Sequence, residues 1–257
     1  MRALAWLAAC GMALLALAGQ ARAEQQDIRL GRYESRTIVT GTDLRSRPTG
    51  FAACLADVLV KVSGDPTATD DPRLPAVAGQ PAAFVADFDY WDRMSGISHH
   101  DEQGSSDRPY NLTVRFVPAR VDAALRALGR QPWPDPRPVL VPLIHVTAAS
   151  GVFDITREEP RAAGMRAALA ESGEKYGMAL RIPPPPLPDA AALPPGEAAV
   201  AGSLVLSEAA HGWVGTWHLD WQGRGYDWGL SGVNFDEAFR QAVRGAMQIV
   251  SGHGLPR

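Results

Sequence analysis

The sequence predicts an α+β protein of two small modules, each a mixed or antiparallel sheet of a few strands covered by about two helices. Two observations support this prediction. Segments with strand-like alternation recur between segments whose apolar residues repeat every three or four positions, as on one face of a helix. Four prolines at alternate positions of 132–138 can continue neither a helix nor an inner strand. We therefore place a proline-rich linker at 132–138, between an N-terminal module (24–131) and a C-terminal module (139–257).

Residues 1–23 have the pattern of a signal peptide. Arg2 supplies the positive charge, residues 3–18 are mostly apolar, and small residues flank Arg22 at a cleavage site that ends with Ala23. The apolar stretch is shorter than the roughly 20 residues of a membrane span. We therefore expect cleavage after Ala23, export to the periplasm, and no transmembrane segment in the mature chain.

A lipoprotein signal is the second interpretation of this segment, because Leu7-Ala8-Ala9-Cys10 matches the pattern that precedes a lipid-modified cysteine. Only about six apolar residues precede Cys10, fewer than the roughly 7 to 15 of an ordinary signal peptide. The cleavable signal is therefore the preferred interpretation. Cleavage leaves Cys54 as the one cysteine of the mature chain, where it falls in an apolar helical pattern and is expected to be buried.

The composition indicates an ordinary globular protein with an acidic balance. Removal of the signal takes away two arginines and changes the formal net charge from −3 to −5. An acidic chain is a poor partner for nucleic acid. The sequence also has no glycine-rich phosphate loop of the G-x-x-x-x-G-K-[ST] form, and we expect no cofactor.

The N-terminal module begins with a β-prone run at 33–40. A helix is expected over 51–62, because apolar residues recur there on one helical face, and Gly64 ends it. These apolar residues are Phe51, Leu55, Val58, Leu59 and Val62. A weaker helix is expected over 81–92, which is rich in alanine and aromatic residues.

A polar stretch at 94–108 has no apolar period and predicts a surface loop. Apolar and polar residues then alternate over 110–116, which predicts a half-buried strand. Pro118 suits the first turn of the next helix, and Gly129 ends that helix. The predicted order of elements in this module is therefore strand, helix, weaker helix, strand and helix.

The C-terminal module opens with a nearly continuous apolar run at 139–146, typical of a strand covered on both faces. Pro142 within it indicates an edge or a bulge. A helix is expected over 158–176 and a short strand over 178–182. The insertion at 183–195 is rich in proline, which predicts a stiff, extended excursion.

Three strands are expected after this insertion, at 199–206, 213–222 and 225–231. A tight turn that contains glycine makes the last two a hairpin. The final helix is strongly amphipathic, and Asn234 or Asp236 can cap its N-terminus.

Tryptophans mark one side of the strand at 213–222. Trp213, Trp217 and Trp221 share one parity and so one face of the strand, and Trp228 on the partner strand extends the aromatic surface. An exposed row would be a platform for sugar rings or for a protein, whereas a buried row would pack beneath the last helix. These four residues form the binding face that the sequence suggests.

Catalytic and metal motifs are weak. His99, His100, Asp101 and Glu102 are adjacent in the polar loop, where neighbouring side chains do not converge easily on one ion, so we expect no metal site. No G-x-S-x-G elbow is present for a serine nucleophile. The sequence therefore assigns no catalytic residue and favours a protein that is not an enzyme.

Three segments resemble the DUF2066 family of exported proteins of Gram-negative bacteria. They are residues 58–66, the strand at 110–116 together with 121–129, and the proline-rich 137–142. The resemblance spans about residues 27 to 252, and its motifs are structural rather than catalytic. It implies an exported α+β protein and gives no catalytic residue to carry over.

Two functional hypotheses remain open. The first is a non-enzymatic periplasmic binding or scaffold module that binds another envelope protein through a sheet edge or the tryptophan face, with peripheral association with the envelope. The alternative is a peptidoglycan- or glycan-binding protein, or a hydrolase, in which the tryptophans stack on sugars beside Asp220 or Asp227. Paired carboxylates could also include Asp236, but their spacing fixes no catalytic separation, and turn and capping roles are favoured.

Overall fold

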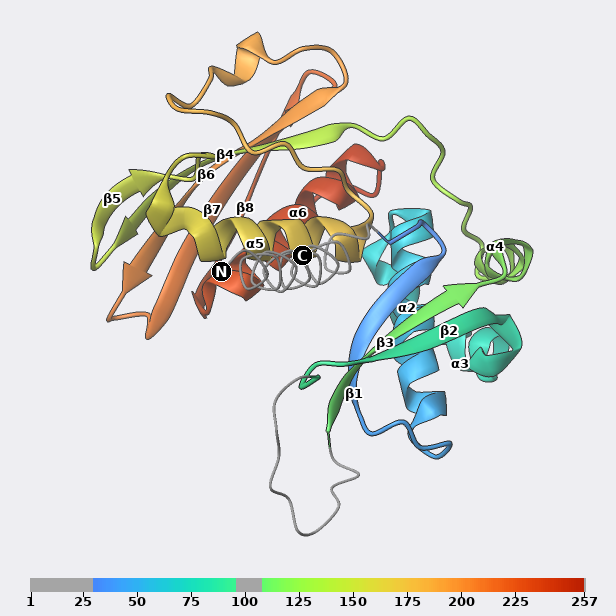
Figure 1. Cartoon of the computed structure of the whole chain (residues 1–257). Coiled ribbons are helices and arrows are strands. Elements are labelled where there is room, and N and C mark those ends of the chain that lie inside the picture. The colour runs from blue at the N-terminus through green and yellow to red at the C-terminus, as the bar shows by residue number, and fades with distance from the viewer. Residues whose placement is uncertain (1–29, 96–107, 257) are drawn as a thin grey trace, which may run out of the picture. The chain divides into compact units, whose positions relative to one another are not determined.

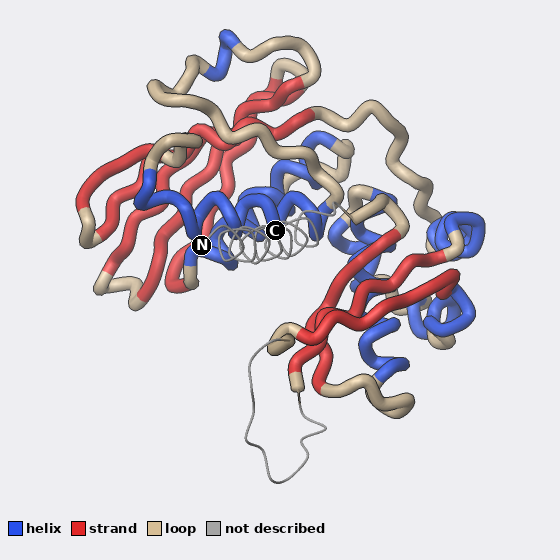
Figure 2. Tube along the Cα trace, viewed as in Figure 1, coloured by secondary structure: helices blue, strands red, loops and turns tan. Residues whose placement is uncertain are grey.

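Two sheets and their helices form the part of the chain that the computed structural model describes, residues 30–95 and 108–256 (Figure 1). The α+β class is confirmed, and the strands of both sheets are drawn in red in Figure 2. Among the described residues, no helix combines the length and the apolar character needed to cross a membrane. The predicted signal segment 1–23, with Cys10, lies outside the described residues.

The first sheet contains three antiparallel strands in the order β1-β3-β2. The strands are β1 (Glu34–Thr40), β2 (Val85–Asp92) and β3 (Pro109–Phe116). Strand β1 was predicted from its β-prone run and β3 from alternation, and Leu112 and Val114 of β3 are fully buried. The alternation therefore identified the face of β3 that meets the core.

Helix α2 (Arg47–Ser63) contains the predicted helix and carries its five apolar residues on one face. All five of these residues are buried against the first sheet, and Cys54 is buried beside them. Gly64 ends the helix at a φ of 70°, a left-handed conformation that glycine adopts readily, and its N–H donates to the carbonyl of Val60.

The prediction of a weaker helix over 81–92 is wrong. Only a single turn, Pro81–Phe84, is helical, and the chain then enters strand β2. Phe88 and Tyr90 pack against the core while Asp87 and Asp89 lie on the other side, which is an alternation with period two. The alanine content suggested a helix, but cross-strand pairing with β3 decides the conformation.

Shorter helical elements complete this half of the chain. They are the turn Pro66–Asp70, α3 (Leu74–Ala78) and α4 (Pro118–Ala127). Helix α4 begins at the predicted proline, and its residues Val121, Ala124 and Leu125 are buried. The linker at 132–138 then runs along the end of α2, where Trp133 N–H donates to Val62 O and the Arg137 guanidinium donates to Lys61 O.

The second sheet contains five strands in the order β5-β4-β6-β7-β8. They are β4 (Val139–Ala148), β5 (Gly151–Asp154), β6 (Glu197–Ser207), β7 (Gly212–Trp221) and β8 (Arg224–Val233). Strands β4 and β6 are parallel and the other neighbours are antiparallel. Strand β5, which has four residues, was not predicted from the sequence. The predicted strand at 178–182 is reduced to one bridge between Leu180 and Leu140.

Pro142 lies at a true gap in the pairing. On the side of β4 that its nitrogen faces, β5 pairs only with residues 145–148, and Leu180 bridges only at Leu140. The missing N–H of proline therefore costs no ladder hydrogen bond. The edge character that the sequence indicated is confirmed at this position.

Helices α5 (Ala163–Tyr176) and α6 (Phe235–Val250) pack on one side of the five-stranded sheet (Figure 1). The side chain of Asn234 caps α6 by accepting from Glu237 N–H, as one of the two predicted caps. Leu140 and Ile144 of β4, Leu204 of β6 and Trp217 of β7 meet these helices. Residues of the opposite parity form the other side of the sheet, which we call the open face.

The division into modules stays a prediction. Strands of residues 34–116 form one sheet and strands of residues 139–233 form the other, with the proline-rich linker between them. Contacts within Gly31–Arg257 nevertheless place both sheets in one compact unit. One such contact is the hydrogen bond that the Ser251 hydroxyl donates to Gly64 O.

Candidate functional site: a groove on the open face

Strand register aligns polar side chains across the open face. His145 of β4 lies opposite Asp154 of β5 on one side and Ser203 of β6 on the other. Ser203 in turn lies opposite Thr216 of β7. Because paired residues of neighbouring strands share a face, these four side chains form one transverse row, which we call the polar row.

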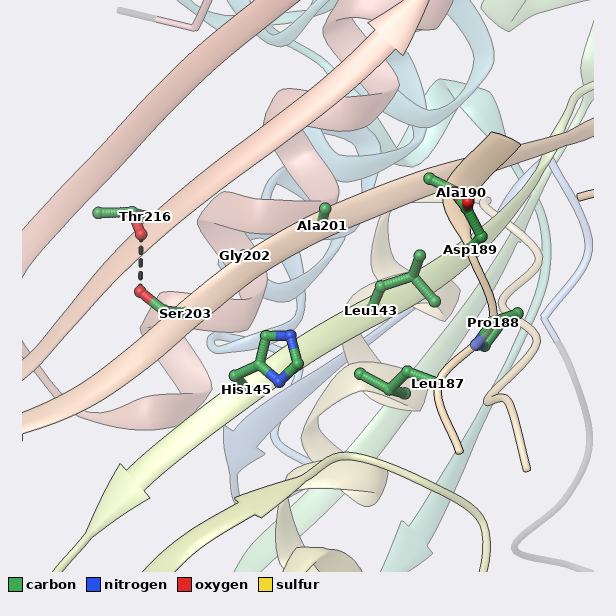
Figure 3. Close-up of a pocket in the computed structure, with 10 residues that line it drawn as sticks. All are labelled: Leu143, His145, Leu187, Pro188, Asp189, Ala190, Ala201, Gly202, Ser203 and Thr216. Atoms are coloured by element: carbon green, nitrogen blue, oxygen red, sulfur yellow. Dashed lines mark hydrogen bonds between the residues drawn. The ribbon is translucent and has the colours of Figure 1, made fainter. Parts of the chain in front are cut away.

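A groove of about 710 Å³ follows this row on the open face (Figure 3). Its walls come from strands β4, β6 and β7 and from the proline-rich segment 183–195, which crosses the same side of the sheet. The lining residues are Leu143, His145, Leu187, Pro188, Asp189, Ala190, Ala201, Gly202, Ser203 and Thr216. The groove therefore joins an apolar end at Leu143 and Leu187 to the hydroxyl and imidazole groups of the polar row.

The proline-rich segment has little regular structure of its own. Its one helical element is the turn Ala190–Ala192, capped by Asp189, whose carboxylate accepts from Ala191 N–H. Prolines fix φ and lower the conformational entropy of the unfolded segment, so a proline-rich wall is ordered at a small entropic cost. This property suits a wall that must keep a groove open.

Two histidine–aspartate pairs are held on the open face. His145 Nδ1 lies 2.6 Å from Asp154 Oδ1, and His218 Nδ1 lies 2.7 Å from Asp227 Oδ1. The hydrogen bond to Asp227 raises the pKa of His218 above its ordinary value of 6.5, and Asp220, 3.4 Å from Nε2, acts in the same direction. Both rings are thus oriented by carboxylates.

The polar row contains the residue types of a catalytic triad, a carboxylate, an imidazole and a hydroxyl, but not its hydrogen bonds. The Ser203 hydroxyl lies 2.8 Å from the Thr216 hydroxyl, and the described residues include no hydrogen bond from Ser203 to His145. A nucleophile needs its base within hydrogen-bond reach. Among the described residues, the polar row therefore has two separate hydrogen-bonded pairs, His145–Asp154 and Ser203–Thr216.

The predicted tryptophan face lies on the side of the sheet that the helices cover. Trp217 is 2% exposed, and its ring centroid is 6.4 Å from that of Phe239 in α6. Trp213, Trp221 and Trp228 are half-buried against the same core. The indole N–H of Trp228 donates to Gln241 O, in the same helix. Trp217 and Trp228 therefore contact α6, and all four rings pack against the core on the covered side of the sheet, as in the second of the two alternatives that the sequence left open.

The sequence contained part of the signal for the open face. Alternation in β7 already placed Thr216, His218 and Asp220 opposite the tryptophans. His145 and Ser203 were missed because an apolar run hides the parity of β4, and because parallel pairing of β4 with β6 cannot be deduced from either strand alone. The groove itself depends on where the proline-rich segment crosses the sheet, and no local pattern encodes that position.

Other candidate groups show no site among residues 30–95 and 108–256. No group of three or more metal-type ligands is arranged there to hold an ion, and the cluster at His99, His100, Asp101 and Glu102 lies outside these residues. Burial raises the pKa of the Cys54 thiol to about 12, which keeps it protonated and unreactive. Asp236 lies in the first turn of α6.

Comparison with known proteins identifies one domain. Residues 29–134 match the model of a family described as a domain of unknown function, DUF8605. The match agrees with the expectation of a domain of unknown function, but the matched family is not the expected DUF2066 family. No curated protein and no solved structure matches the chain. The matched residues contain the first sheet, and the groove on the open face lies outside them.

Proposed function

We propose that this chain is an exported, non-enzymatic binding protein of the cell envelope that holds a segment of another protein in the groove on its open face. The observation that carries the proposal is the groove itself, with an apolar end and a polar row on one side of a sheet. Binding sites are typically concave, largely apolar and equipped with a few fixed polar groups. The polar row meets this description because each of its four side chains has a hydrogen-bond partner within the row.

Rigidity of the floor supports the same function. The sheet that forms the floor packs on α5 and α6 through fully buried residues such as Ile144, Leu204 and Phe239. A floor that does not rearrange reduces the ordering cost of binding. An extended segment of a partner fits such a groove because its side chains alternate between the floor and solvent.

Export is proposed from the first 23 residues, whose charge, apolar stretch and small residues suit a cleavable signal. A periplasmic location follows from export in a Gram-negative cell. Fractionation of cells that produce the full chain tests this part. Recovery of a product shortened by about 23 residues in the periplasmic fraction supports it, whereas full-length protein in the cytoplasm contradicts it.

The glycan-binding alternative has weaker support. It needs exposed indole rings for stacking on sugars, whereas Trp217 is buried and the other three tryptophans are half-buried against the same core. Co-sedimentation with purified peptidoglycan tests it directly. Sedimentation that persists when the groove is blocked would favour this alternative over the groove.

Site-specific photocrosslinking tests the groove. A photoreactive residue at Thr216 should crosslink one discrete envelope protein, whereas the same residue at the exposed Glu171 of α5 should not. The substitution Ala201→Trp places a large ring in the groove, and Ala209→Trp places the same ring at an exposed turn as a matched control. Loss of the crosslink in A201W and its retention in A209W is the expected result. A crosslink that survives in A201W would contradict the proposal.

A further inference from the structure

Acidic side chains surround the groove. Asp154, Asp220 and Asp227 lie on the open face, and Asp189 lies on the proline-rich wall. By parity, the strand positions of the open face include no lysine and no arginine, and neither do the residues that line the groove. The basic groups at these strand positions are two histidines, and Arg181, beside β4, pairs with Glu197 of the same face, which leaves the four aspartates without a lysine or arginine partner among the described residues. The open face therefore carries a negative field at neutral pH.

The carboxylates have room for an additional partner. The side chain of Asp227 is 82% exposed and that of Asp220 is 78% exposed, although both face His218. Asp154 contacts His145 through Oδ1 and is 40% exposed. The raised pKa of His218 agrees with this negative field, because Asp227 and Asp220 both stabilise the imidazolium.

The geometry sets the spacing of a complementary partner. Asp154 on β5 and Asp227 on β8 are four strands apart, roughly 19 Å at about 4.8 Å per strand. An extended chain advances about 3.3 Å per residue, so roughly six residues separate two cationic groups that reach both carboxylates. Between them, Leu143, Leu187 and Ala201 provide an apolar end of the groove for one aliphatic side chain.

We infer that the occupant of the groove is an extended protein segment with two lysine or arginine residues about six positions apart and an aliphatic residue between them. This inference rests on the proposed function and adds the chemistry of the partner. Charge complementarity contributes specificity and association rate, and the aliphatic side chain removes apolar surface from water.

Fluorescence anisotropy with labelled peptides tests the inference on the exported chain. The probe is a seven-residue peptide with lysine at both ends and leucine in the middle, and the matched peptides carry glutamate at both ends or glycine in the middle. We expect the lysine–leucine peptide to bind at least tenfold more tightly than the glutamate peptide. We also expect its affinity to fall as salt rises from about 50 to 500 mM.

Variants assign the binding to the open face. D154N and D227N keep an oxygen that accepts from the histidine ring but remove the charge, and each should weaken binding by about threefold, as for an exposed ion pair. D70N removes one exposed carboxylate outside the groove and should leave the affinity unchanged. A201W should abolish binding.

In the peptide assay, three results would overturn the inference. They are no binding of the lysine–leucine peptide at millimolar concentration, equal loss of affinity in D70N and D227N, and full competition by spermine with no dependence on the central leucine. A groove-dependent crosslink in cells to a neutral or acidic segment would overturn this inference while leaving the proposed function intact. Absence of any groove-dependent crosslink would instead remove the proposed function itself.

Discussion

The ammonium group of Lys61 donates a 2.7 Å hydrogen bond to the backbone carbonyl oxygen of Glu34, linking α2 to β1. Lys61 is 1% exposed, one of the largest fully buried side chains of the described residues. Burial lowers its pKa from 10.5 to about 8, although Glu174, Asp57 and Glu34 act in the opposite direction. A buried lysine with one backbone partner is therefore a group whose protonation is coupled to folding.

We predict that Lys61 makes stability depend on pH between about 8 and 10.5. In this interval the unfolded chain holds the proton on Lys61 and the folded chain does not, so the contribution of Lys61 to stability grows as pH rises. This contribution is fully present above the pKa that Lys61 has in the unfolded chain, and it is lost as the pH falls through the pKa that Lys61 has in the folded chain.

Denaturant unfolding of the native chain and of K61M at several pH values measures this effect. The difference in unfolding free energy between the two should move in favour of the native chain by at most about 1.4 kcal/mol per pH unit. Subtracting the unfolding free energy of K61M from that of the native chain cancels the contributions of Cys54, Tyr33 and Tyr176. The raised pKa values of these three groups make stability depend on pH in a neighbouring pH range. A difference that stays flat from pH 8 to 10.5 would contradict the prediction.

Gly177, at the end of α5, is predicted to be intolerant of a side chain. Its φ is 64°, and a Cβ there would lie 2.6 Å from Lys61 Cγ. The substitution G177A therefore combines backbone strain of about 1–2 kcal/mol with overpacking of about 1–3 kcal/mol. Thermal or denaturant unfolding should show a loss that is the sum of the two effects.

Gly196 provides the matched control for this substitution. Its φ is 89°, also in the left-handed range, but no atom lies within 4 Å of the added Cβ. G196A should therefore show only the strain. K61A should recover part of the loss in G177A, because it removes the atom that the new methyl group meets. Equal destabilisation by G177A and G196A would show that contact with Lys61 is unimportant.

The sequence was sufficient for elements whose pattern is local. The hydrophobic periods correctly predicted three elements. They are the helix that contains Phe51 to Val62, strand β3 and the amphipathic final helix. The sequence predicted a helix where the structure has β2, because the pairing of β2 with β3, with Tyr90 opposite Leu112, is not visible in the local pattern. The groove could not be predicted, because it requires parallel pairing of His145 with Ser203 and the position of Leu187, both set by contacts between distant residues.

The titration of His218 on the open face is predicted to depend on its hydrogen bond with Asp227. The pKa of His218 is raised, mainly by the hydrogen bond that its ring donates to Asp227, so D227N should lower this pKa towards its ordinary value. Because the folded pKa exceeds the unfolded one, the pair stabilises the fold below the unfolded pKa, and this contribution is lost as pH rises through the folded pKa. Histidine NMR signals followed from pH 5 to 9 measure the shift.

D154N is the control for this titration, because Asp154 pairs with His145 and lies four strands from Asp227. It should leave the signal of His218 nearly unchanged, since exposed charges at that separation are largely screened at physiological salt. An equal shift of His218 in D154N and D227N would mean that the general field of the face, rather than the direct hydrogen bond, sets the pKa.

Acrylamide quenching should separate the tryptophans by exposure. Trp91 of β2 is 36% exposed, whereas Trp217 is 2% exposed beneath α6. Acrylamide must reach the ring by collision, so W91F should lower the quenchable fraction of the fluorescence and W217F should raise it. Because Phe is smaller than Trp, W217F leaves a cavity at Phe239, and its circular dichroism and unfolding must be measured first. Strong quenching that disappears in folded W217F would place Trp217 at the surface and restore the tryptophan row as a stacking platform.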